Sequence, residues 1–97
     1  MASMLFMIVG YLRSGAEDQL IEFRNEFSEH LAQPSPNIAA IGVLRDRDGR
    51  RRGYLGFVET DSFDNAERFL KDSPFYQENL YERIDVFEYD VEVGKVG

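Results

Sequence analysis

The chain has 97 residues, of which 43% are hydrophobic and 30% are charged, as in one soluble globular domain with a modest core. It has no cysteine and one histidine, which excludes disulfides, cysteine nucleophiles and metal sites rich in cysteine or histidine. The net charge of −7 argues against a nucleic-acid partner, because nucleic-acid binding depends on neutralising phosphates.

The first predicted element is a strand in the uncharged apolar run Met4–Tyr11. A half-exposed strand would alternate apolar and polar residues, so this run predicts a strand buried on both faces. It is too short to cross a bilayer and lacks the basic region and cleavage site of a signal peptide. We therefore expect a cytoplasmic protein without a membrane partner. We interpret Met1-Ala2-Ser3 as a remnant or an upstream start ahead of a natural beginning at Met4.

A helix is predicted from Ala16 to about Gln33. Its apolar residues recur at intervals of three and four, which places them on one stripe: Leu20, Phe23, Phe27 and Leu31. Prolines at positions 34 and 36 end the helix, because proline lacks the backbone donor.

A β-hairpin follows the helix. Its strands are Ile38–Arg45 and Gly53–Val58, and the Asp-x-Asp-Gly sequence of Asp46–Gly49 predicts the turn. Alternation along the second of these strands places Leu55 and Phe57 on one face. The opposite face then receives Tyr54 and Val58, so this strand too is apolar on both sides.

The last third of the chain predicts a helix and a final strand. Asp61-Ser62 is a suitable cap for a helix over Phe63–Lys71. Asp72-Ser73-Pro74 ends it, and a short helical turn over 75–79 leads to a strand from about residue 81 to 91. The apolar residues of this strand change phase between Val86 and Phe87, which predicts a β-bulge there.

The order βαββαβ predicts an α+β ferredoxin-like sandwich. In this fold an antiparallel four-stranded sheet has the first strand in its interior and two helices on one face. The other face would expose a large apolar patch, because the first and third strands are apolar on both sides. We therefore expect a homodimer in which two sheets pack face to face.

The RNA-recognition motif shares this topology and is the first alternative. The run Arg52-Gly53-Tyr54-Leu55-Gly56-Phe57-Val58 resembles the motif by which the third strand of that family stacks bases. Leu55 is an extra residue in the pattern, and it places Tyr54 and Phe57 on opposite faces. RNA binding is therefore not expected.

A second resemblance lies in the C-terminal half. The segments that carry it are Asp61-Ser62-Phe63 with Ala66, Asp72-Ser73-Pro74-Phe75, and Leu80-Tyr81-Glu82 with Ile84 and Val86. They resemble the YciI-like (YCII-related) family over about residues 4–93, within a single domain of residues 1–97. The resemblance implies a dimeric α/β barrel, a cleft with a His–Asp pair and, in some members, lyase or isomerase-like chemistry on small molecules. Muconolactone isomerases and cofactor-free monooxygenases share the barrel more distantly.

The catalytic pair of that family is displaced in this sequence. The family histidine stands three residues after an arginine and before a leucine. Here Phe27 follows Arg24 at that distance, and the His-Leu pair is His30-Leu31, one turn further. An ungapped alignment places Phe27 at the histidine position, and a short gap places His30 there. The aspartate position before the proline holds Ser73, and Asp72 stands one residue earlier.

His30 and Asp72 are the candidate catalytic residues. An ordinary pKa near 6.5 suits His30 to proton transfer at neutral pH, and a neighbouring carboxylate would orient it and raise its pKa. The corresponding hypothesis is proton abstraction or elimination, without cofactor or metal, on a small cyclic or hydroxylated organic acid. In the alternative, His30 is a half-buried boundary residue and the protein is a non-catalytic dimeric binding module.

Two further groups of residues have more than one interpretation. Arginines at positions 45, 47, 50, 51 and 52 lie within eight residues. They form either a solvated hairpin that protects an edge strand or a guide for an anionic substrate or an acidic partner. We interpret six aromatic residues as core and dimer interface in preference to a substrate site: Tyr54, Phe57, Phe75, Tyr76, Tyr81 and Phe87.

Overall fold

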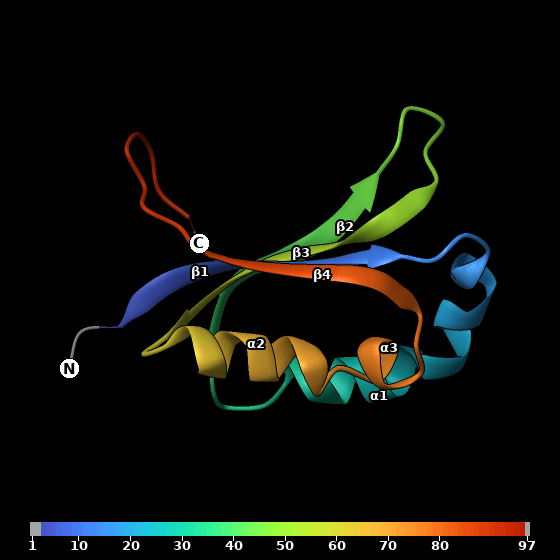
Figure 1. The fold of residues 1–97 in the computed structure, drawn as a ribbon, viewed down its shortest axis with the longest axis horizontal. Coiled ribbons are helices and arrows are strands. Elements are labelled where there is room, and N and C mark those ends of the chain that lie inside the picture. The colour runs from blue at the N-terminus through green and yellow to red at the C-terminus, as the bar shows by residue number, and fades with distance from the viewer. Residues whose placement is uncertain (1–2, 97) are drawn as a thin grey trace.

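The structure is a computed structural model that describes residues 3–96; residues 1 and 2, to which the interpretation of the start applies, lie outside this range. Its elements are β1 (Met4–Leu12), the 3-10 helix η1 (Ala16–Phe23), α1 (Arg24–Leu31), β2 (Asn37–Arg45), β3 (Arg51–Thr60), α2 (Phe63–Lys71), α3 (Pro74–Gln77) and β4 (Tyr81–Glu88). The strands form one antiparallel sheet in the order β2-β3-β1-β4. All helices lie on one side of it (Figure 1). The predicted ferredoxin-like sandwich, with the first strand inside the sheet, is confirmed.

Local hydrogen bonds explain the elements whose ends were predicted closely. In the β2–β3 turn, Oδ1 of Asp46 accepts hydrogen bonds from the backbone N–H groups of Asp48 (2.9 Å) and Arg50 (3.0 Å). Oγ of Ser62 accepts from the backbone N–H of Asn65 at 3.1 Å and caps α2, which spans the predicted residues. Within residues 3–96, no helix is long and apolar enough to span a membrane.

The first helix is not continuous. The segment begins as the 3-10 helix η1 and becomes the α-helix α1 after Phe23, whose φ of −110° and ψ of 13° lie outside the helical region. A spacing of three between Leu20 and Phe23 suits three residues per turn as well as 3.6. The apolar stripe therefore predicted which residues pack inward, and it could not distinguish the two helix types.

The predicted bulge in the last strand is wrong. Val86 lies opposite Ile8 and Phe87 lies opposite Met7, in unbroken register, and the irregularity falls between Tyr11 and Leu12. β4 also ends at Glu88 and not at residue 91. The change of phase arises because both faces of β4 carry apolar residues, and the strand does not shift.

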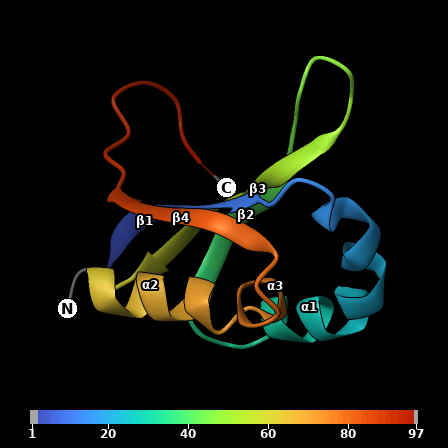
Figure 2. The same cartoon turned by 45° about the vertical axis from the view of Figure 1, so that its right-hand side comes forward.

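The two faces of the sheet have different cover. The helix side holds the core, in which Phe6, Ile8 and Val58 are buried. Figure 2 shows that no helix of the described chain covers the other side, from which the β2–β3 hairpin and the C-terminal segment rise. Alternation along the paired strands directs these apolar residues to it: Leu5, Met7, Val9, Leu55, Phe57 and Phe87. We call this surface the open face.

Tyr54 and Phe57 lie on opposite faces, as predicted. The Tyr54 ring contacts Phe27, with centroids 5.2 Å apart, on the helix side. The Phe57 ring contacts Tyr89 edge-on at 5.0 Å on the open face. The third strand therefore offers no pair of aromatic rings on one face for stacking bases.

Candidate functional site

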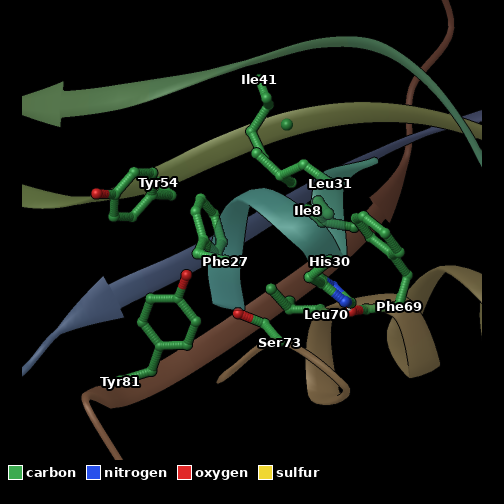
Figure 3. A pocket seen from close by; sticks show the side chains of 11 residues that line it. Ile8, Phe27, His30, Leu31, Ile41, Tyr54, Phe69, Leu70, Ser73 and Tyr81 are labelled. Carbon is green, nitrogen blue, oxygen red and sulfur yellow. The ribbon is translucent and has the colours of Figure 1, made fainter. Parts of the chain in front are cut away.

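A small cavity lies between the sheet and the helices (Figure 3). Its walls come from β1, α1, β2, β3, α2, β4 and the α2–α3 connection, and its volume is about 20 Å³, room for about one water molecule. The lining residues are Ile8, Phe27, His30, Leu31, Ile41, Tyr54, Gly56, Phe69, Leu70, Ser73 and Tyr81. Most of this surface is aliphatic or aromatic, so its few polar groups decide what it can bind.

His30 is the one imidazole of the chain, and it is only 7% exposed. Its Nε2 lies 2.8 Å from the carbonyl oxygen of Phe69 and therefore donates a hydrogen to it. Nδ1 then carries the lone pair, and it accepts a hydrogen bond from the side-chain amide of Gln33 at 2.9 Å. The two bonds fix one tautomer of neutral histidine with both ring nitrogens satisfied.

Burial lowers the pKa of His30 below its ordinary value of 6.5, and this outweighs two opposing effects. The hydrogen bond to the carbonyl of Phe69 and the negative charge of Asp72 both raise the pKa. Asp72 is the exposed C-cap residue of α2, and it lines a surface groove together with His30. Within residues 3–96, His30 and Asp72 share no hydrogen bond or ion pair. The predicted pair is thus within electrostatic reach but is not hydrogen-bonded.

These surroundings predict opposite pKa changes in two variants. Asp72→Asn should lower the pKa of His30 further, because it removes a charge that stabilises the imidazolium. Gln33→Leu should raise it, because the amide of Gln33 donates to the neutral ring. NMR titration of the ring protons measures both, and the single histidine makes the signal unambiguous. A higher pKa in Asp72→Asn would contradict the assigned interaction.

The lowered pKa also gives the sign of a stability change with pH. The unfolded chain binds a proton near pH 6.5, its ordinary value, whereas the folded chain does so only at lower pH. The unfolded state therefore holds more protons in this window, and His30 reduces stability as the pH falls through about 6.5. The loss levels off below the pKa of folded His30. A His30→Gln variant should lack this component in urea unfolding measured between pH 5 and 8.

Tyr81 supplies a buried hydroxyl to the cavity. Burial is the main cause that raises its pKa, the electrostatic effect of the neighbouring Tyr54 adds to it, and the hydroxyl of Ser73 opposes it by hydrogen bonding. Tyr81 therefore remains a protonated phenol that can donate a hydrogen bond at neutral pH. Its ring lies against β1 at Gly10, where a Cβ atom would be 2.5 Å from Cζ of Tyr81. Glycine at position 10 makes room for this ring.

Phe27 separates the cavity from a larger groove. Its ring stacks on Phe75 at 4.2 Å with an interplanar angle of 17° and contacts Tyr54. Phe27 and Tyr54 also line a groove of about 380 Å³ between the η1–α1 segment and the β2–β3 hairpin. Figure 3 shows the Phe27 ring between Tyr54 and His30. These two aromatic residues form the wall between the inner cavity and the outer groove.

Comparison with known proteins identifies the family. The family model described as "YCII-related domain" matches residues 4–90 of this chain. The chain belongs to the YCII-related family. No curated protein matches its sequence.

Solved structures show the same fold at low sequence identity. A 5-chloro-2-hydroxyhydroquinone dehydrochlorinase from Burkholderia phenoliruptrix, in complex with 2,5-dihydroxybenzoquinone, has a TM-score of 0.79 and 22% identity, over 90% of this chain and 94% of that one. A dimeric ferredoxin-like protein of unknown function from Thermobifida fusca has a TM-score of 0.54 and 14% identity, over 94% and 93%. The cofactor-independent oxygenase SnoaB from Streptomyces nogalater has a TM-score of 0.53 and 14% identity, over 97% of each chain.

In this YCII-related chain, both candidates for the family histidine position line the cavity. Phe27 and His30 lie one turn apart on α1, and Ser73, at the family aspartate position, lines the cavity as well. Asp72 does not line the cavity; it lines the surface groove that it shares with His30, which is distinct from the outer groove. Tyr54 and Tyr81, interpreted from sequence as core or interface, belong to the cavity wall.

Two partners of His30 were not predicted from the sequence. Gln33 follows His30 by three residues and lies just beyond the end of α1, and the predicted helix, which reached about Gln33, would already have placed the two side chains side by side. The carbonyl of Phe69 could not, because no sequence pattern indicates which backbone oxygen meets a side chain 39 residues away.

Proposed function

We propose that this YCII-related protein binds a small, planar, hydroxylated organic molecule between its sheet and helices, and that it catalyses cofactor-free proton transfer on that molecule. The observation that carries the proposal is a neutral, buried histidine of fixed tautomer in a wall that is otherwise aromatic, aliphatic and hydroxyl-bearing. The similar dehydrochlorinase was solved with 2,5-dihydroxybenzoquinone, a planar ring with hydroxyl groups. This likeness supports the ligand class.

His30 is the proposed general base, and its lowered pKa keeps it neutral at pH 7. Nδ1 carries the lone pair and takes a proton from the substrate once Gln33, which is exposed, turns toward solvent. The electron pair of the broken bond forms a new double bond. A leaving group then departs with its own bonding pair, or a neighbouring double bond shifts and its electron pair takes the proton back from the imidazolium of His30 at another carbon. The negative charge of Asp72 stabilises the imidazolium formed in this step.

Phe27 is the side chain that must move for a ring to enter. A cavity of about 150 Å³ binds benzene, whereas this one holds about 20 Å³. Phe27 is half-buried and also borders the outer groove, so rotation of its ring joins the two spaces. Entry of the ligand thus requires one rotamer change and no rearrangement of the sheet.

Binding and turnover are tested separately. 2,5-dihydroxybenzoquinone should bind the wild-type protein, as followed by calorimetry. Tyr81→Phe should weaken binding about tenfold, because it removes one buried donor. His30→Gln should still bind the quinone, but should release chloride from a chlorinated trihydroxybenzene at least about 100-fold more slowly. Glu22→Gln, an exposed change outside both spaces, is the control and should match the wild type.

Two results would count against the proposal. Failure of the wild-type protein to bind the quinone removes the ligand class. Binding of the quinone by the wild type without any chloride release removes the roles of His30 and Asp72. In that case the protein is the non-catalytic binding module.

We also propose that two copies form a homodimer through their open faces. The centre of the face is apolar, and Phe87 is 53% exposed on it. Arg83 and Asp85 lie toward one edge of the open face, where Nη2 of Arg83 is 3.3 Å from Oδ2 of Asp85. A second copy related by a two-fold axis would therefore present both a positive and a negative charge to this edge. The similar Thermobifida fusca protein, described as dimeric, supports this arrangement.

A further inference from the structure

The outer groove is lined by arginine side chains and by aromatic rings. Figure 2 shows η1 and the β2–β3 hairpin at the same end of the sheet, and residues of both line this groove. Arg24, Arg45 and Arg51 line it together with Phe27, Tyr54 and Phe75, and its remaining lining includes Glu17 and Asp18. We call it the arginine groove. Of the five clustered arginines, it takes in Arg45 and Arg51.

The guanidinium groups of the arginine groove are not neutralised by direct contacts. The two ion pairs of residues 3–96 lie elsewhere, between Lys71 and Glu67 and between Arg83 and Asp85. The groove thus brings three guanidinium groups against two carboxylates, in a chain whose net charge is −7. One further negative charge would balance it.

Neutral acceptors hold two of these arginines in place. Nη1 of Arg45 donates to the carbonyl of Gly49 at 3.0 Å, and Nη1 of Arg51 donates to the hydroxyl of Tyr54 at 3.4 Å. A guanidinium has five N–H donors, so each keeps donors for a ligand. Arg51 is also only partly exposed, whereas Arg47 and Arg50 are exposed and do not line the groove. Protection of the edge strand does not require this inward placement of Arg51.

We infer that the arginine groove binds a carboxylate on the aromatic ligand, so that the substrate class is a hydroxylated aromatic acid. This inference rests on the proposed function. A ring that passes Phe27 into the inner cavity leaves a substituent on the groove side of the shared wall. Arg51, which contacts Tyr54 in that wall, is placed to meet it. Arginine binds carboxylates through paired, charge-assisted hydrogen bonds.

Two probes that differ by one carboxylate test the inference: hydroquinone and 2,5-dihydroxybenzoate. The wild-type protein should bind the acid about 10–100-fold more tightly than hydroquinone at low salt, because charge-assisted hydrogen bonds increase affinity by about this factor. Added sodium chloride should reduce this preference. Arg51→Gln should remove most of the preference and leave hydroquinone binding within about threefold of the wild type. Arg47→Gln is the matched control, because it makes the same change of charge outside the groove.

The outcomes separate this inference from the proposed function. Equal wild-type affinities for the two probes would overturn the arginine groove and leave the hydroxylated-ring ligand in place. Binding of neither probe would overturn the proposed function, and the inference with it. An equal loss of preference in Arg47→Gln and Arg51→Gln would show that the positive charge of the whole hairpin attracts the acid. It would overturn the inference that the arginine groove binds the carboxylate.

Discussion

Replacement of Gly53 by alanine is expected to lower the free energy of unfolding by about 3 kcal/mol. A Cβ atom at this position would lie 2.3 Å from the carbonyl oxygen of Gly10, an atom of the β1 backbone. β1 and β3 are the two inner strands of the sheet, so neither can move without disturbing an outer partner. Overpacking costs about 1–3 kcal/mol in cores, and a backbone atom cannot rotate away as a side chain can. The upper end of that range is therefore expected.

Gly42→Ala is the matched control for this prediction. It makes the same change in β2, where a Cβ atom would meet nothing within 4 Å. Its effect should be stabilising by about 0.5–1 kcal/mol, because alanine costs less backbone entropy than glycine. Urea unfolding at equal protein concentration compares the three proteins. A Gly53→Ala midpoint equal to that of the wild type would contradict the close approach of β1 and β3.

The elements predicted well are those whose ends depend on local chemistry. Asp46 binds two backbone N–H groups of its own turn, and Ser62 caps α2, so the hairpin and that helix could be read from a few neighbouring residues. The break at Phe23 and the phase change at Val86 are different. Both depend on what packs against a segment, and one apolar pattern fits two backbone geometries there. Such choices are made by tertiary contacts.

The candidate site shows the same division. His30 could be singled out from its chemistry and from the family resemblance, and it lies in the cavity wall as a pocket residue should. Its partner could not be found in the same way. The sequence suggested Asp72, which stands one residue before the family aspartate position, whereas the ring bonds to the carbonyl of Phe69 and to Gln33. That Arg24 lies beside the clustered arginines could be seen only in the fold, because 20 residues, which include most of α1 and β2, separate it from Arg45 in the sequence.

Phe57→Asp is expected to convert the proposed homodimer to a monomer at micromolar concentration. Phe57 lies on the inner strand β3, at the centre of the open face, and its ring contacts Tyr89. A carboxylate there would be removed from water without a partner on dimerisation, at a cost of about 2 kcal/mol or more. A two-fold interface contains the change twice. Dimerisation should therefore weaken about 1,000-fold, as sedimentation equilibrium measures.

Ile21→Asp controls for the added charge. Ile21 is 72% exposed on η1, on the helix side, so this variant makes the same kind of change away from the open face and should remain a dimer. Circular dichroism checks that Phe57→Asp keeps its fold. A wild-type chain that sediments as a monomer would contradict the pairing of sheets. A folded Phe57→Asp that stays dimeric would place the interface on another surface. A monomeric wild type would thus show that the chain does not dimerise at all. A dimeric Phe57→Asp would show that it dimerises through a surface other than the open face.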